Sequence, residues 1–254
     1  NYVEVLAKDI DTHSKYMLHT EPFTIEYTGG ESVPHAYTIG FYVGDGYGNH
    51  INVYSEKKRK LPLSGNWAAD GHQNGKPKWR LSGLPFDWSE ATGLRSDLSP
   101  VFGWSPDSII SFISGLADAD GSNTTSGGIR IYQGSENFVR QLQLLLTKVG
   151  IRSSVCFMSS DQTNLGKRNK PIWYVSITDT QKLACHRLVC DRSGFGKKNR
   201  HQTIVSVTPL DGTHPSFCFH EPETTKAVFG NSLTGQCNLV ETVLSRFNDD
   251  VEGL

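Results

Sequence analysis

The chain has 254 residues, of which 37% are hydrophobic and 20% are charged, and its formal net charge is −1. This length and composition allow a sizeable buried core, which excludes wholesale disorder. The longest mostly apolar stretch, residues 109–117, is about half as long as a membrane span, so no transmembrane helix is predicted. The first residues lack a basic-then-apolar signal, and we expect an intracellular protein without a membrane partner.

Basic residues gather in three short segments despite the near-neutral total. They are Lys57, Lys58, Arg59 and Lys60; Lys167, Arg168 and Lys170; and Lys197, Lys198 and Arg200, together ten of the 25 lysines and arginines. Such clusters are typical of nucleic-acid contacts, although a solvated loop is the simpler explanation of any single one. The five cysteines have an odd count and no C-x-x-C pair, so neither a disulfide framework nor a zinc site is indicated.

The first half of the chain shows one clear helix. It is predicted over residues 35–45 and ends at the pair Asp45-Gly46. Possible strands follow at residues 50–54 and 76–81. Residues 82–103, which contain prolines, aromatic residues and glycines, have no clear period and are predicted to be irregular.

The second half is more regular. Ser105, Pro106 and Asp107 supply a cap, a first-turn proline and an early acid for a helix that ends at Asp120, where Gly121 is expected to adopt the left-handed cap. Further elements are a strand at 128–133, a helix over 135–150, strands at 151–158 and 172–178, and a last helix at 180–189. The order predicts an α+β unit whose helices cover one face of a sheet, preceded by a shorter and more divergent copy.

Small residues recur four apart in both helices that end in Asp-Gly. In the first helix they are Gly40 and Gly44, and in the second they are Gly115 and Ala119. Residues four apart share one helix face, and small residues there let a second helix approach closely. If the two stripes face each other, Asp45 and Asp120, 75 positions apart, become neighbours.

Two carboxylates at neighbouring helix C-termini repel each other and lie at the negative ends of both helix dipoles. Hard divalent cations relieve this repulsion, and Mg²⁺ commonly shares its oxygen ligands with substrate phosphates. Because a metal pair assists phosphodiester hydrolysis, the pattern favours a nuclease with Mg²⁺ as its cofactor. An Asp-Gly pair alone is also an ordinary turn signal, as we expect for Asp70-Gly71 and Asp211-Gly212.

Residues 39–46 (IGFYVGDG) and 113–121 (ISGLADADG) resemble the paired motifs of the LAGLIDADG homing endonucleases, the second closely. The resemblance spans residues 35–198 and is to the monomeric members, whose pseudo-symmetric repeats form a saddle of sheet over the DNA major groove. It implies that Asp45 and Asp120, with the preceding Gly44 and Ala119, hold the catalytic metal ions. A lysine near the end of each repeat is expected beside the scissile phosphates: Lys197 or Lys198 in the second repeat, and Lys76 or Lys78 in the first.

The implied partner is one long double-stranded DNA target. Candidates for DNA contacts are Lys57, Lys58, Arg59, Lys60, Lys76, Lys78, Arg130, Lys167, Arg168, Lys170 and Arg200. The alternative is a protein of the same fold that binds DNA or RNA without cleaving it, as a maturase or a degenerate passenger. The presence of both acids favours cleavage.

The C-terminal part resembles the splicing region of an intein, with a junction at Gln236 and Cys237, since a terminal amide cyclises and the next residue must be a nucleophile. Residues 237–243 (CNLVETV) are similar to a host segment of ribonucleotide reductases. Gly235 and Thr225 stand where inteins often have histidines, and the N-terminal splicing blocks are not recognisable before residue 35. We therefore expect no splicing by this chain alone. A longer intein, a complementary N-terminal intein half and lost splicing all stay open, and a protein-splicing element is a further functional alternative.

These resemblances divide the chain into five segments. Residues 1–34 are a splicing-domain remnant or an N-terminal extension, 35–104 and 105–198 are the two endonuclease repeats, 199–236 form the splicing segment, and 237–254 are the host tail.

Overall fold

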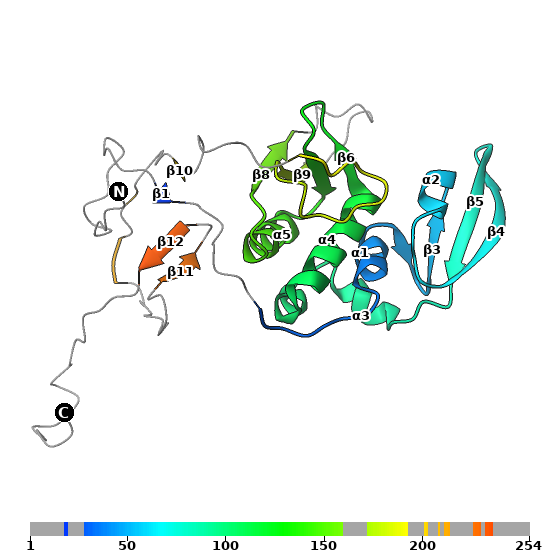
Figure 1. The fold of residues 1–254 in the computed structure, drawn as a ribbon, viewed down its shortest axis with the longest axis horizontal. Coiled ribbons are helices and arrows are strands. Elements are labelled where there is room, and N and C mark those ends of the chain that lie inside the picture. Colours follow the sequence, from blue (N-terminus) through cyan, green and yellow to red (C-terminus); the bar gives the residue numbers. More distant parts are fainter. Residues whose placement is uncertain are drawn as a thin grey trace, which may run out of the picture. The chain divides into compact units, whose positions relative to one another are not determined.

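The computed structural model describes residues 28–159 and 172–192, together with residue 208 and the short stretches 18–19, 201–202, 211–213, 226–229 and 232–235. The chain divides into two units, residues 22–199 and residues 1–21 with 200–254. Within the described part of the chain, the larger unit contains the helices and two four-stranded antiparallel sheets (Figure 1).

The first repeat begins with helix α1 (Ala36–Asp45). Its strands are β2 (Gly46–Tyr47), β3 (His50–Val53), β4 (Asn66–Gln73) and β5 (Lys76–Ser82), which form a sheet in the order β2-β3-β5-β4. Three short helical segments complete it: α2 (Glu56–Arg59), α3 (Trp88–Gly93) and the 3-10 helix η2 (Ser99–Gly103).

The second repeat has the same plan. It contains helix α4 (Pro106–Asp120), strands β6 (Gly121–Asn123) and β7 (Ile129–Gln133), helix α5 (Glu136–Lys148), and strands β8 (Ser153–Met158) and β9 (Ile172–Ile177). The sheet order is β6-β7-β9-β8, so in both repeats the strands lie in the order first, second, fourth, third. The predicted α+β fold with two pseudo-symmetric repeats is confirmed.

Helices α1 and α4 lie side by side (Figure 1), and their backbones pack against each other at two glycines. A Cβ atom on Gly40 would lie 1.9 Å from the carbonyl oxygen of Phe112, and one on Gly115 would lie 1.9 Å from that of Tyr37. Gly115 and Phe112 occupy in α4 the places of Gly40 and Tyr37 in α1, so the contact is reciprocal, as it is across a two-fold axis. The predicted small-residue seam is confirmed.

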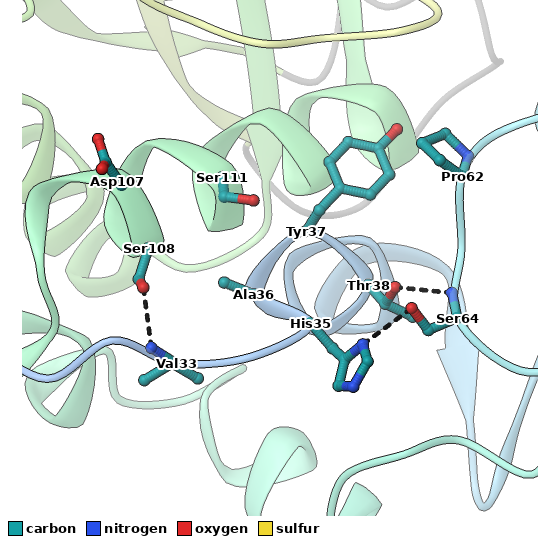
Figure 2. A pocket seen from close by; sticks show the side chains of 10 residues that line it. All are labelled: Val33, His35, Ala36, Tyr37, Thr38, Pro62, Ser64, Asp107, Ser108 and Ser111. Carbon is teal, nitrogen blue, oxygen red and sulfur yellow. Dashed lines mark hydrogen bonds between the residues drawn. The ribbon is translucent and has the colours of Figure 1, made fainter.

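Side-chain hydroxyl groups tie flanking segments to the N-terminal ends of the two helices (Figure 2). The Val33 N–H donates to Ser108 Oγ at 2.9 Å, and the Ser64 N–H donates to Thr38 Oγ1 at 3.0 Å. A pocket of about 290 Å³ lies at this end of the helix pair. Because α1 and α4 both end in their acids at the other end, this pocket is separate from the predicted active site.

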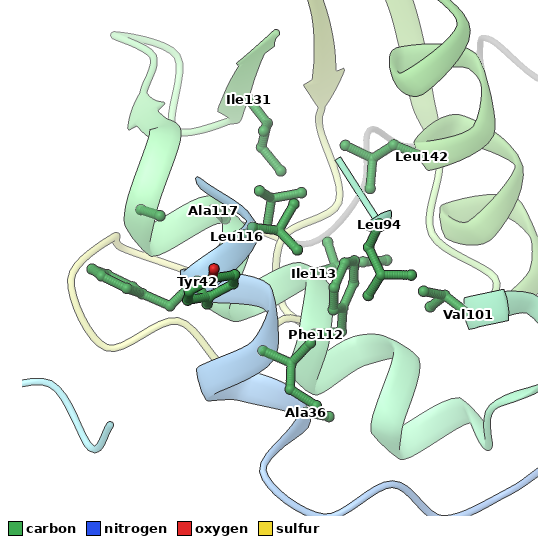
Figure 3. Packing of buried hydrophobic residues seen from close by; sticks show 14 of the residues in the cluster. Ala36, Tyr42, Leu94, Val101, Phe112, Ile113, Leu116, Ala117, Ile131 and Leu142 are labelled. Carbon is green, nitrogen blue, oxygen red and sulfur yellow. The ribbon is translucent and has the colours of Figure 1, made fainter. Parts of the chain in front are cut away.

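The hydrophobic core surrounds α4 and joins the two repeats. Phe112, Ile113 and Leu116 of α4 are fully buried, together with Tyr42 of α1 and Leu142 of α5 (Figure 3). The helix is buried on nearly all sides because α1 covers one face and the second sheet and α5 cover others. Such burial is typical of a central helix rather than a surface helix.

The left-handed cap predicted at Gly121 is wrong, and Gly46, which ends the first motif helix, is not left-handed either. Gly46 has φ −73° and ψ 156°, and Gly121 has φ −91° and ψ 166°, which continues each helix directly into a strand. Glycine is required here for space. A Cβ on Gly46 would lie 2.5 Å from the carbonyl oxygen of Tyr42, and one on Gly121 would lie 2.5 Å from that of Ala117.

The predicted last helix at residues 180–189 is also wrong, because this segment is a non-helical loop. Several of its backbone N–H groups bond to side chains of α4, and those of Thr180 and Val189 bond to the Arg192 carbonyl and the Asn123 side chain. The buried carboxylate of Asp118 accepts from the N–H groups of residues 186, 187 and 188, at 2.6–3.1 Å, and Ser114 Oγ accepts from Ala184 N at 2.9 Å. Tyr37 Oη donates to the same carboxylate at 2.7 Å.

Other predicted elements agree better. The strands expected at 50–54, 76–81, 128–133, 151–158 and 172–178 lie within two residues of β3, β5, β7, β8 and β9. Residues 82–103 are less irregular than predicted, since they contain α3 and η2. Asp70-Gly71 is not a hairpin turn: it lies inside β4, at a register shift against β5 where Gly71 has φ 77°.

The described residues of the smaller unit form two antiparallel strand pairs. Strand β1 (Leu18–His19) pairs with β10 (His201–Gln202), and β11 (Lys226–Phe229) pairs with β12 (Ser232–Gly235). Among the described residues, no helix combines the length and apolarity that crossing a bilayer needs.

Candidate active site

Asp45 and Asp120 end α1 and α4, and the seam brings their carboxyl groups together. A Cβ on Gly44 would lie 2.6 Å from the Cβ of Ala119 and 3.0 Å from Asp120 Oδ2. The charge of Asp45 also raises the pKa of Asp120, which requires a short separation. The two acids are therefore neighbours as expected, and their catalytic role stays a prediction.

The surroundings of Asp120 disfavour its ionised form. Burial is the largest cause, followed by the negative charge of Asp45, and together they raise the pKa of Asp120 to about 6. The Lys58 ammonium, the hydrogen bond from Gln133 and the Arg95 guanidinium act in the opposite direction. The site thus carries negative charge that its own donors compensate incompletely.

Each acid receives a side-chain donor from the residue thirteen positions beyond it. Lys58 Nζ donates to Asp45 Oδ2, and Gln133 Nε2 donates to Asp120 Oδ2 at 2.9 Å. The shared spacing makes these residues counterparts in the two repeats, one charged and one neutral. From the sequence, Lys58 is expected only as a DNA contact, and Gln133 is not among the predicted site residues.

Two arginines that the sequence analysis did not single out hold the C-terminal turns of the motif helices. Arg95 donates to the carbonyl oxygens of Tyr42, Val43 and Gly46, and Arg187 donates to those of Ala117, Asp118 and Gly121, at 2.5–3.1 Å. In both repeats these carbonyls belong to the third and second residues before the acid and to the residue after it. A guanidinium group there adds hydrogen bonds to helix-end carbonyls, of which those of Tyr42 and Ala117 also accept the N–H of the glycine after the acid. Its charge opposes the negative end of the helix dipole.

A cavity of about 440 Å³ opens beside Asp45 and is lined by β3, α2 and the start of β5. Lys58 and Lys76 line it, and so does Asn52. Asn52 Oδ1 is buried and has no hydrogen-bond partner among the described residues. The cavity beside Asp45 is therefore lined by a residue with an additional oxygen acceptor.

The donors at this site suit a hard cation. Among the described residues, no group of three or more His, Cys, Asp or Glu side chains converges, so a metal ion here depends on few carboxylates. Mg²⁺ fits such a site, because it binds through one or two carboxylates, accepts neutral oxygens and keeps several waters. The oxygens available are those of Asp45, Asp120, the Ala119 carbonyl and the Asn52 amide.

The predicted DNA-contacting residues have different surroundings. Lys57 and Lys60 are exposed on or next to α2, whereas Arg59 stacks its guanidinium 4.6 Å from the centre of the Trp79 ring. Lys78 Nζ lies 2.7 Å from Asp70 Oδ2, so this candidate for the first-repeat lysine is ion-paired away from the acids.

In the second repeat, the guanidinium of Arg130 lies 5.0 Å from the centre of the Tyr174 ring. The remaining predicted residues lie outside the described part of the chain; they are Lys167, Arg168, Lys170, Lys197, Lys198, Arg200, Gln236 and Cys237.

The second repeat is similar to a known family of domains. Residues 107–195 match the family model of the LAGLIDADG-like domain. The chain is also 26% identical, over 267 residues of alignment, to the ribonucleoside-diphosphate reductase large subunit of Invertebrate iridescent virus 6. That alignment covers 94% of this chain and 27% of the viral protein, so the chain spans about a quarter of the length of this relative.

Solved structures of I-DmoI are also similar to this chain. The structures of I-DmoI in complex with DNA and Ca, and with DNA and Mn, each have 17% sequence identity and cover 58% of this chain. They are covered over 84% and 90% of their own length, with TM-scores of 0.42 and 0.41.

Proposed function

We propose that this protein is a site-specific DNA endonuclease that hydrolyses phosphodiester bonds in both strands of a duplex with Mg²⁺ as its cofactor. The observation that carries the proposal is the acid pair, Asp45 and Asp120, at the ends of two helices that pack glycine against backbone. Each acid lies directly before the first strand of its own sheet. The match of residues 107–195 to the LAGLIDADG-like domain supports this assignment.

The chemistry follows from the groups around the acids. Asp45, Asp120 and the Ala119 carbonyl would hold the cation, and Asn52 lines the cavity beside Asp45. When bound, Mg²⁺ supplies an activated water and offsets charge on the phosphate. Arg95 and Arg187 fix the helix-end turns, and the amide of Gln133 orients the Asp120 carboxylate.

The polar faces of the two sheets are the proposed DNA-binding surface. In the second sheet, Arg130 and Tyr174 alternate along their strands with Ile131 and Val175, which are fully buried. In the first sheet, Arg80 alternates with the buried Leu81. Arginine and hydroxyl side chains on such faces suit contacts with phosphates and base edges, and two repeats in one chain suit a monomer on one target.

We propose further that the endonuclease is carried by an intein of a ribonucleotide reductase large subunit and acts inside the cell. The similarity to the viral reductase subunit along most of this chain supports the host assignment. The grouping of residues 1–21 with residues 200–254 in one unit is the arrangement expected if residues 22–199 are inserted within a splicing domain. The pairing of β1 with β10 is consistent with this arrangement.

The test is cleavage of a plasmid that carries the uninterrupted reductase sequence. The protein is incubated with this plasmid and Mg²⁺, and the variants D45N and D120N are compared with the wild type. We expect double-strand cleavage at one site by the wild type and none by either variant, while DNA binding in a gel-shift assay persists. Binding without cleavage by the wild type would contradict the proposal and favour a non-cleaving passenger.

A further inference from the structure

Lys58 contacts both motif helices at the ends that carry the acids. Its ammonium group donates to Asp45 Oδ2 and, at 2.9 Å, to the carbonyl oxygen of Ala119. It also lies 5.7 Å from the centre of the Phe41 ring. The side chain is 24% exposed, so the contacts are partly shielded from water. One residue of the first repeat therefore joins the end of α1 to the end of α4.

The acceptors of this lysine are oxygens that a bridging divalent cation would use. The Asp45 carboxylate and the Ala119 carbonyl lie on opposite sides of the seam, and Lys58 Nζ bonds both of them. An ammonium group and a divalent cation that share these oxygens would repel each other at contact distance. Binding of the divalent cation therefore requires Lys58 to move, which its flexible four-carbon stem and the adjoining cavity permit.

The counterpart position in the second repeat carries no charge. Gln133, also thirteen residues after its acid, donates a neutral amide N–H to Asp120 at 2.9 Å. At this position the two repeats therefore differ: the first acid has a charged lysine donor and the second has a neutral amide donor. Both side chains reach the carboxylate of their acid from the same position in the repeat, so the difference in charge comes from the residue type and not from the backbone.

We propose that Lys58 is a built-in cation of the acid pair, which compensates Asp45 in the metal-free protein and competes with the divalent cation for the same oxygens. This inference rests on the cation site of the proposed function. It makes Lys58 a positioning residue that sets how tightly the metal is held. Removing the lysine should therefore strengthen metal binding, which is the opposite of what loss of a ligand or of a structural contact does.

The test is the variant K58Q of the full chain, which gives both repeats the same neutral donor. Titration with Mn²⁺ alone, without DNA, is followed by calorimetry at pH 7.5. We expect K58Q to bind Mn²⁺ about tenfold more tightly than the wild type, which corresponds to about 1.4 kcal/mol. Metal-free K58Q should unfold at a lower temperature, and Mn²⁺ should raise its unfolding temperature by more than that of the wild type. The control K57Q removes an exposed charge on the same helix and should leave Mn²⁺ affinity within about twofold.

The reciprocal variant Q133K places a second ammonium group against Asp120 and should weaken Mn²⁺ binding by about tenfold. It also decides the question if K58Q does not fold. Unchanged or weaker binding by K58Q, unchanged or tighter binding by Q133K, or a gain in K57Q equal to that in K58Q would overturn the inference. Plasmid cleavage distinguishes failure of this inference from failure of the proposed function. If the wild type cleaves but the variants do not change the Mn²⁺ affinity, only the role of Lys58 is refuted. If the wild type never cleaves, the endonuclease function is refuted.

Discussion

Replacing Gly115 by alanine tests the helix seam that brings the acids together. The new Cβ would lie 1.9 Å from the carbonyl oxygen of Tyr37 and 2.9 Å from the backbone nitrogen of Phe41. Carbon–oxygen contacts are normally about 3.3 Å or longer, so the helices would have to separate by about 1.4 Å. Overpacking of this kind costs about 3 kcal/mol, and the better helix propensity of alanine returns about 1 kcal/mol. The net loss of about 2 kcal/mol should lower the unfolding temperature by about 4–8 °C.

The assay is thermal unfolding together with plasmid cleavage. G115A should also cleave about 100-fold more slowly, because a displacement of about 1 Å at an active site has effects of that size. G93A is the matched control, since Gly93 ends α3 with open space around its Cβ position and an exposed backbone. G93A should be as stable as the wild type or more stable. If G115A behaves like G93A, the close seam is wrong.

Three further predictions concern the groups around the acids. R187M should lower the free energy of unfolding by about 4 kcal/mol, because three hydrogen bonds from a charged donor are lost. R187K should recover less than half of this loss, since one ammonium group cannot reproduce the hydrogen bonds of the planar guanidinium group. D120N without divalent cations should be up to about 3 kcal/mol more stable than the wild type at pH 7.5. The reason is that the pKa of Asp120 in the folded protein, about 6, exceeds its ordinary value of 3.8, so the wild type loses this stability as the pH rises through 6. Below about pH 4, urea unfolding should give the same stability for both proteins. D118N should lower the free energy of unfolding by about 3 kcal/mol and increase hydrogen exchange at residues 184–188. The reason is that the amide NH₂ group would face backbone N–H groups that donate to the carboxylate in the wild type.

Local sequence signals predicted the parts of the fold that depend on local interactions. The caps at Ser105 and Ser135 begin α4 and α5, and each side chain accepts a hydrogen bond from the third residue beyond it. The glycine stripe at Gly40 and Gly115 predicted the seam, since glycine is unfavourable in a helix without close packing. The seam in turn predicted that the two acids, Asp45 and Asp120, are neighbours.

Contacts between distant residues account for what the sequence did not predict. The segment 180–189 has a helical pattern, but Asp118 and Ser114, about 70 positions earlier, bind its N–H groups. Arg95 and Arg187 likewise act on carbonyl groups about 50 and 70 positions away, and no local pattern marks them.

Two features could have been found from the sequence. Asp87, three residues before Glu90, is a cap signal for α3. Aligning the two motifs on their acids places Lys58 against Gln133, which identifies them as counterparts.

Asp45 and Asp120 are proposed to form one cation site across the seam. Mn²⁺ affinity in the wild type, D45N, D120N and the double variant measures this directly, because coupling between the two substitutions reports whether the carboxylates share an ion. If they share one ion, each single variant loses most of the Mn²⁺ affinity, and the double variant binds no more weakly than the weaker single variant. Losses that simply add, or a single variant that binds Mn²⁺ as tightly as the wild type, would contradict it.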